Sequence, residues 1–188
     1  MLKPLEEYGN YVEISGFRDV KVGDVRGFVE GVCEELPADV EVQLFDAALI
    51  ATWEHLYFAA LNAHMAFKNK RNISKSLAVE AALYASSQRQ IKKALDFIGV
   101  KEESVNVAVL VFGADAASVQ AGISVVARCL GVAPDESVLE LSEAKMGRIR
   151  SAFSISGAEF EAVSSRGNEE QALVDLVIER VALLSTRL

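Results

Sequence analysis

The stretch NVAVLVF, residues 106–112, is apolar at every position after Asn106 and rich in valine. β-Branched residues favour extended backbone, and a strand with no polar alternation is typical of burial on both faces. The stretch therefore predicts a central strand covered by helices on either side. YVEISGF, from Tyr11 to Phe17, and VEVQLFDA, from Val40 to Ala47, alternate enough to predict two more strands, the second with one wetter face.

Helical spacing of apolar residues accounts for most of the remaining chain. We expect helices at 24–35, 52–70, 74–86, 88–99, 115–130 and 168–185, one beginning near Ser142, and a short extended piece at 137–141. Asp24, Ser74 and Asp115 are the expected N-caps. We see no internal repeat and no domain boundary. The sequence therefore predicts one α/β domain over residues 1–188, with a small mixed β-sheet covered by several α-helices.

The composition is that of an ordinary globular protein, with 51% hydrophobic and 24% charged residues. No stretch of about 18 apolar residues is present, so no membrane span is expected. The N-terminus lacks the apolar core of a signal peptide. Cys33 and Cys129 lie far apart in sequence, which favours two reduced, core-filling thiols. These features indicate a cytoplasmic protein.

Charge is distributed unevenly along the chain. The net charge of −8 argues against a general nucleic-acid binder. Between Lys68 and Lys93, however, seven cations stand against one anion, Glu80, so this segment carries +6 and the rest of the chain −14. An acidic body with one basic segment predicts a local anion site.

The basic segment combines cations with apolar and amide side chains. Arg89, Lys92 and Lys93 are spaced to share one helix face, opposite an apolar stripe that includes Ile91. Upstream cations lie at the end of one predicted helix and the start of the next: Lys68, Lys70, Arg71 and Lys75. Several cations without internal partners favour a phosphate backbone, and interleaved Ile73, Leu77 and Tyr84 suit unstacked bases of a single strand.

Structural explanations for the same residues remain open. Cations in the last turn of a helix are favoured by the helix dipole whatever the protein does, which accounts for Lys68, Lys70 and Arg71. Lys92 and Lys93 also fit an ordinary solvated helix face. Charge pattern alone therefore does not decide between an RNA site and a solvated surface.

A search for catalytic and metal-binding groups finds none. His55 and His64 are nine residues apart and face opposite sides of one helix, so they do not form a metal pair. His64 lies on an apolar stripe and is expected as a hydrogen-bonded core histidine; the stripe comprises Trp53, Leu56, Tyr57, Ala60, Leu61, His64 and Phe67. Gly113 stands alone where a nucleotide-binding loop needs several glycines. We expect no catalytic residue, metal or cofactor.

Residues 76–99 resemble a known family. The pattern is a Ser76-Leu77 helix start with Glu80, an aliphatic-Tyr-x-Ser core running into Gln-Arg-Gln-Ile at residues 88–91, and a Gly99 close. With matching features near Ile155, at Glu159-Phe160 and along 173–184, the chain resembles the tRNA-binding regulatory subunit of the KEOPS complex, the family of the PRPK-binding protein. That family has a glycine where this chain has Ser87, so the resemblance leaves the geometry of this turn open.

The resemblance implies a function. KEOPS makes threonylcarbamoyladenosine in tRNAs, and subunits like this one bind and stimulate its small atypical kinase, beside a threonylcarbamoyltransferase subunit. They capture the single-stranded 3′ CCA end of the tRNA and have no catalytic residues. The expected phosphate contacts are Lys68, Lys70, Arg71, Lys75, Arg89 and Lys92, and the residues expected near bases are Asn72, Ile73, Tyr84, Gln88 and Gln90.

Two other hypotheses stay open. In one, the protein is a pure scaffold that binds the kinase through an apolar helix face, with the long C-terminal helix as a candidate, and makes no RNA contact. In the other, it is a small-molecule enzyme, which requires a pocket where titratable groups converge.

Overall fold

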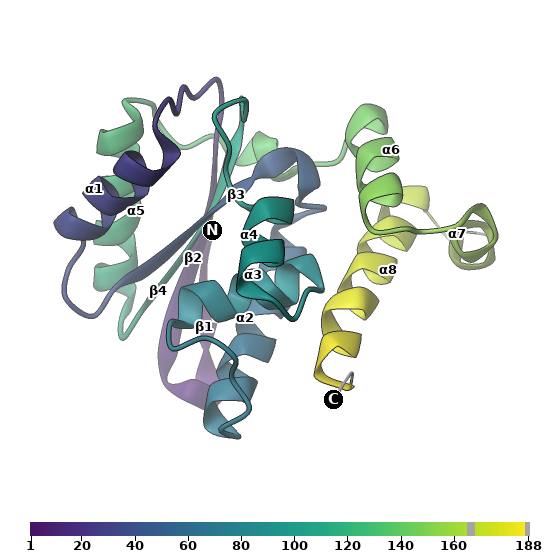
Figure 1. The fold of residues 1–188 in the computed structure, drawn as a ribbon, viewed down its shortest axis with the longest axis horizontal. Helices are drawn as coiled ribbons and strands as arrows, with labels where there is room; N and C mark the ends of the chain where they lie inside the picture. The colour runs from purple at the N-terminus through teal and green to yellow at the C-terminus, as the bar shows by residue number, and fades with distance from the viewer. Residues whose placement is uncertain (165–167, 187–188) are drawn as a thin grey trace.

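The apolar stretch predicted as a central strand does lie inside the sheet. The computed structural model describes residues 1–164 and 168–186. Its four-stranded sheet has the order β1-β2-β4-β3, from β1 (Leu2–Leu5), β2 (Asn10–Phe17), β3 (Glu41–Asp46) and β4 (Val107–Gly113) (Figure 1). All three pairings are antiparallel. The α/β class is confirmed, but the mixed sheet was wrong: β2 and β3 run in the same direction, yet β4 lies between them and pairs with both.

Strand β4 is buried on both faces, as predicted. Its valines Val107, Val109 and Val111 face one hydrophobic cluster, while the alternating residues Ala108, Leu110 and Phe112 face the other. The first cluster is closed by α1 (Val25–Glu35) and α5 (Ala116–Leu130), which lie together on one side of the sheet (Figure 1). Period-two alternation of uniformly apolar residues thus supplies both halves of the core.

Helices α1 and α5 begin where their caps were expected. The Asp24 carboxylate accepts the N–H of Gly27, and Asp115 accepts that of Ser118. Helix α5 passes close to the sheet because Gly122 has no side chain: a Cβ there would lie 2.7 Å from a methyl carbon of Val111.

The second cluster lies under α2 (Trp53–Lys68), α3 (Leu77–Ser86) and α4 (Ile91–Ile98), with α6 (Glu143–Ala152), α7 (Gly157–Ser164) and α8 (Glu169–Leu183) farther from the sheet (Figure 1). The 3₁₀ turns are η1 (Glu6–Tyr8), η2 (Ala47–Leu49), η3 (Glu136–Leu139) and η4 (Leu184–Thr186). The piece predicted as extended at 137–141 is thus mostly the 3₁₀ turn η3, which Asp135 caps by accepting the N–H of Ser137.

Helix α2 is buried over a wider arc than the single predicted stripe. Its fully or almost fully buried residues are His55, Leu56, Ala59, Ala60, Ala63, His64 and Ala66. His64 is buried as expected, but its Nε2 has no hydrogen-bond partner among the described residues, so the expected hydrogen-bonded state was wrong. The ring stacks instead on Tyr8, with ring centroids 5.0 Å apart.

Two local predictions fail because tertiary contacts override sequence signals. The predicted wetter face of β3 contains the fully buried Phe45, and the Glu41 carboxylate on that face accepts hydrogen bonds from Ser76 Oγ at 2.5 Å and Ala78 N at 3.1 Å. Helix α3 therefore covers this face. Its N-cap is Ser76, whose hydroxyl accepts the N–H of Val79, rather than Ser74.

The cysteines and the C-terminal helix also differ from expectation. Cys33 is exposed and Cys129 only half-buried, so they are not core-filling; the one buried residue of α1 is the neighbouring Val32. The apolar face of α8, including Leu173 and Val177, is buried within the chain's own core. That face is therefore not free for a kinase, which removes the candidate surface named for the scaffold hypothesis.

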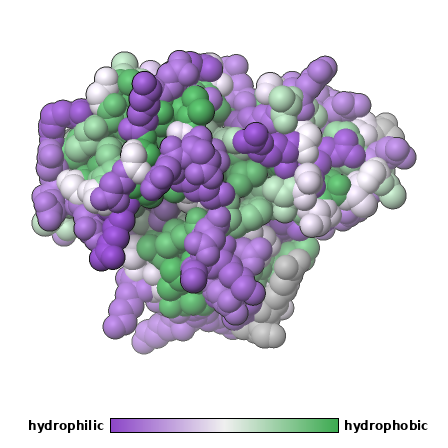
Figure 2. Space-filling view, turned by 45° about the horizontal axis from the view of Figure 1, so that its top comes forward, coloured by the Kyte–Doolittle hydropathy of each residue, from purple (hydrophilic) through white to green (hydrophobic). Residues whose placement is uncertain are grey.

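The face of the molecule in Figure 2 is largely hydrophilic, with hydrophobic residues in patches between the polar ones. Such patches are normal on folded proteins. In the part of the chain that the structure describes, no helix combines the length and apolarity needed to cross a membrane.

Candidate nucleic-acid interface

The loop between α2 and α3 carries half of the basic segment and is rigidly held. Two residues after the end of α2 at Lys68, Lys70 adopts the left-handed conformation at φ 54°. Its N–H donates to the Phe67 carbonyl at 3.1 Å, and the Arg71 N–H donates to the Ala66 carbonyl at 2.8 Å. These two hydrogen bonds, made around a left-handed residue, are typical of a helix C-terminus. The end of the helix thus directs Arg71 back alongside α2.

Glu80 holds the other end of this loop. Its side chain is 1% exposed, and one carboxylate oxygen accepts the N–H groups of Ile73 at 2.9 Å and Ser74 at 2.7 Å. Burial raises the pKa of Glu80, while the two N–H donors act in the opposite direction. A buried carboxylate therefore accepts the two loop N–H groups in place of backbone carbonyls.

The turn between α3 and α4 places a second arginine nearby. Ser87 adopts the left-handed conformation at φ 54°, where the Gln88 N–H donates to the Leu83 carbonyl at 3.0 Å. The Ser87 hydroxyl donates to the carbonyl of Arg180 on α8, also at 3.0 Å. This turn is thereby fixed to the C-terminal helix, and Arg89 follows it.

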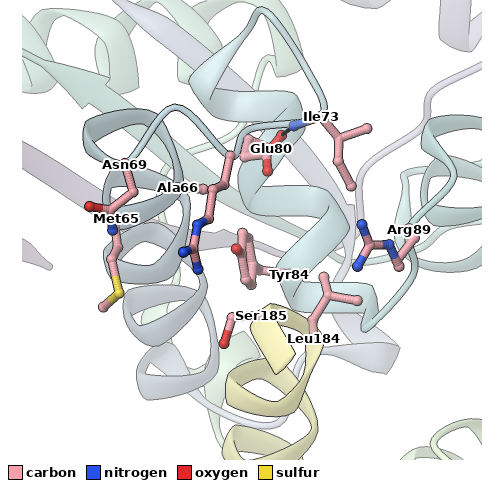
Figure 3. A pocket seen from close by; sticks show the side chains of 10 residues that line it. Met65, Ala66, Asn69, Ile73, Glu80, Tyr84, Arg89, Leu184 and Ser185 are labelled. Carbon is pink, nitrogen blue, oxygen red and sulfur yellow. Dashed lines mark hydrogen bonds between the residues drawn. The ribbon is translucent and has the colours of Figure 1, made fainter. Parts of the chain in front are cut away.

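Between these two turns lies a pocket of about 70 Å³. Its lining residues come from α2, the loop after it, α3, the turn after that and the C-terminal end of the chain: Met65, Ala66, Asn69, Arg71, Ile73, Glu80, Tyr84, Arg89, Leu184 and Ser185. Figure 3 shows Tyr84 near the centre, with Ile73, Arg89 and Leu184 on one side and Met65 on the other. This volume exceeds what one water molecule needs, so it accepts part of a ligand.

The pocket combines apolar walls with two unneutralised cations. Ile73 is 42% exposed at the rim, whereas Tyr84 is 8% exposed. Burial raises the pKa of the Tyr84 hydroxyl, Glu80 adds to the rise, and Arg89 opposes it. Within residues 1–164 and 168–186, neither Arg71 nor Arg89 forms a salt bridge with a carboxylate. Two free guanidinium groups beside an aromatic ring suit a phosphate attached to a flat, apolar group.

The sequence of this chain is similar to those of known proteins. Residues 21–185 match the family described as kinase binding protein CGI-121. The chain belongs to this family. Over 137 residues it is 33% identical to the "Regulatory protein Cgi121" of Methanocaldococcus jannaschii, an alignment that covers 73% of this chain and 85% of the relative.

In this CGI-121 family member, four of the predicted RNA-binding residues line one pocket: Arg71, Ile73, Tyr84 and Arg89. Lys70 and Lys75 are exposed on the loop beside it, and the Asn72 amide donates to the Ser74 carbonyl within that loop. Gln90 is exposed just before α4.

Three predicted residues lie elsewhere. The Lys68 ammonium group lies 5.4 Å from the centre of the Tyr8 ring. Gln88 lines a different pocket, with Phe153 and Arg180. Lys92 is exposed on α4 and does not line the pocket of Arg71 and Arg89, called the arginine pocket below.

The predicted shared helix face of Arg89, Lys92 and Lys93 was wrong. Helix α4 begins only at Ile91, and Ile91 is 38% exposed instead of packed in the core. Arg89 therefore belongs to the turn and to the pocket of Arg71.

The sequence alone did not identify six lining residues as part of a site: Met65, Ala66, Asn69, Glu80, Leu184 and Ser185. Asn69 had a local signal, because it lies directly between Lys68 and Lys70 in the basic segment. Leu184 and Ser185 lie about a hundred positions downstream, and no local pattern connects them with the basic segment.

Proposed function

We propose that this chain is a non-catalytic, cytoplasmic regulatory subunit of a KEOPS complex, which binds and stimulates the small atypical kinase and recruits tRNA through its 3′ CCA end. The complex would carry the threonylcarbamoyltransferase that modifies the tRNA. The observation that supports RNA binding most directly is the pair Arg71 and Arg89, which line one pocket and form no salt bridge with any carboxylate in the described residues.

The shape of the pocket favours a single strand over a duplex. A cavity of about 70 Å³ receives the edge of an unstacked base but not a base pair. Tyr84, Ile73 and Leu184 offer the aromatic and apolar contacts that unpaired bases make, while guanidinium groups bind the adjoining phosphates. Exposed Lys70 and Lys75 extend the positive surface along the loop.

A non-catalytic role agrees with how the titratable groups of the pocket are used. Glu80 and Tyr84 line the pocket together with both arginines, so titratable groups do converge there, as the enzyme hypothesis requires. The Glu80 carboxylate, however, already accepts two backbone N–H groups and thereby supports the loop. The relative from Methanocaldococcus jannaschii is named a regulatory protein.

The test is a gel-shift titration of tRNA with the double variant Arg71→Glu/Arg89→Glu. We expect at least about a hundredfold weaker binding, because charge-assisted contacts are lost and repulsion of phosphates is added. The matched control is Lys21→Glu/Arg26→Glu, which makes the same change of net charge at exposed positions before and on α1, on the other side of the sheet.

Wild-type affinity in the arginine variant, with a normal thermal unfolding curve, would refute this pocket as the RNA site. A second titration uses tRNA that lacks its CCA tail. Unchanged affinity for the shortened tRNA would place the contact elsewhere on the RNA.

A further inference from the structure

The outward face of α2 carries a stripe that is apolar except for Glu54 at its start. Glu54, Phe58, Leu61 and Met65 are spaced by four, three and four residues, so they lie in one line along the helix. Phe58 is 38% and Met65 46% exposed, and they are two of only five large hydrophobic residues exposed in the described part of the chain. The opposite face of α2 is in the core, and Leu61 within the stripe also packs partly against the second cluster, whereas Phe58 and Met65 are exposed.

Aromatic side chains are concentrated at the N-terminal end of this stripe. Tyr57 lies between Trp53 and Phe58, with ring centroids 6.0 Å from each. The Lys3 ammonium lies 4.3 Å from the centre of the Trp53 ring. Trp, Tyr and Phe are enriched in the energetically important centres of protein interfaces, because they bury large areas with few rotatable bonds.

A groove of about 520 Å³ adjoins the stripe where α2 begins. Trp53 and Glu54 line it, together with the carboxylates of Glu136, Glu140 and Glu170. In the described part of the chain, only Glu136 of these four carboxylates has a salt bridge, at 2.8 Å to the terminal amine of Met1. With three carboxylates outside salt bridges the groove is negative, disfavours RNA, and complements lysine or arginine side chains of another protein.

From these observations we propose that the α2 stripe with its acidic groove is the docking surface for the kinase, whose complementary face presents an apolar pocket for Phe58 beside lysine or arginine side chains. The choice of a kinase as the occupant rests on the proposed function and on the family description as kinase-binding. Phe58 is the central anchor, and Glu54 and Glu170 attract the basic rim.

The acidic groove and Phe58 lie in the first half of α2 and the arginine pocket lies near its end, with Met65 shared between the stripe and that pocket. Glu54 is at the start of the helix, whereas Met65 and Ala66, near its end, line the arginine pocket. Substitutions at Glu54, Phe58 and Glu170 therefore leave the lining of the arginine pocket unchanged, so the two proposed activities are separable by mutation.

The experiment measures the dissociation constant of the full-length chain for the purified kinase subunit by calorimetry. We expect Phe58→Glu to weaken kinase binding about tenfold or more, as removal of an interface anchor does. We expect Glu54→Lys/Glu170→Lys to weaken it severalfold, with a smaller dependence on salt. The matched control is Ile91→Glu, since Ile91 is also 38% exposed but lies on α4; it should bind the kinase like the wild type.

Phe58→Glu that binds the kinase as tightly as the wild type overturns the proposal, and so does a loss of binding in Ile91→Glu alone. Kinase binding is also measured with Phe58→Ala and with Glu54→Lys/Glu170→Lys, which change exposed or half-buried side chains and therefore put the fold at little risk. tRNA binding measured in parallel should be unchanged in Phe58→Glu. A wild-type chain that binds tRNA but not the kinase overturns the kinase-binding part of the proposed function as well, whereas a wild-type chain that binds the kinase but not tRNA contradicts the RNA-binding part alone.

Discussion

The hydrogen bonds of the buried His55 ring depend on its protonation state. The ring is fully buried, Nδ1 accepts the N–H of Ala51 at 3.3 Å, and Nε2 lies 2.8 Å from the Ala85 carbonyl. These partners require a neutral ring that carries its proton on Nε2. Burial lowers the pKa of His55 to about 4, and the nearby Lys145 cation contributes to the same shift.

Acid should therefore destabilise the protein through His55. The unfolded chain has a histidine pKa near 6.5, so between about pH 6.5 and 4 it binds a proton that the folded chain rejects. The contribution of neutral His55 to the free energy of unfolding is therefore fully present above pH 6.5. It falls by on the order of 3 kcal/mol as the pH is lowered toward 4. Urea unfolding of the wild type and His55→Gln at pH 7 and pH 4.5 measures it. An equal loss in both proteins would contradict this account.

At the scale of elements, the turns decide where functional side chains lie. Ser87 joins α3 to α4 with φ 54° and ψ 32°, a conformation that costs a non-glycine residue about 1–2 kcal/mol. The hydroxyl bond to the Arg180 carbonyl offsets part of this cost. A glycine, which the resemblance leads us to expect at this position, would adopt this conformation without that cost.

Substitutions at Ser87 should favour glycine over alanine, the reverse of the preference inside a helix, because Ser87 is left-handed at the end of α3. Ser87→Ala keeps the backbone cost and loses the hydrogen bond, so we expect it to destabilise the protein by about 1 kcal/mol. Ser87→Gly loses the bond but removes the backbone cost, so its free energy of unfolding should be close to that of the wild type. Denaturant unfolding of both variants at neutral pH tests this. A glycine variant less stable than the alanine variant would contradict the explanation.

For the molecule as a whole, the proposed function requires that RNA bind at a small positive surface, because the chain carries a net charge of −8. For a single strand, each phosphate contact changes the logarithm of affinity by about −0.7 per logarithmic unit of salt. If Arg71 and Arg89 each neutralise one phosphate, the wild type should show a slope of about −1.4 or steeper, and Arg89→Gln a slope shallower by about 0.7. tRNA titrations between 50 and 200 mM salt measure both slopes, using roughly the range in which this effect is resolved. An unchanged slope would mean that Arg89 contacts no phosphate.

The elements that were predicted correctly have local causes. Strand β4 was recognised because every residue is apolar, and α1 and α5 because Asp24 and Asp115 cap them. Strand β1 and helix α7 were missed, since they are short and lack a strong pattern. The N-cap of α3 was misplaced because a distant carboxylate, Glu41, holds Ser76.

The amino-acid sequence by itself determined the doubly buried strand, the helices around it and a positive segment on a negative chain, since each depends on neighbours within a few positions. Only the tertiary structure decided that Arg71 and Arg89 share a pocket with Leu184. Left-handed residues at Lys70 and Ser87 turn the chain there, and α8 packs against α2 from far along the sequence. The physical reason is that side chains from separate elements meet only after burial of the core has brought those elements together.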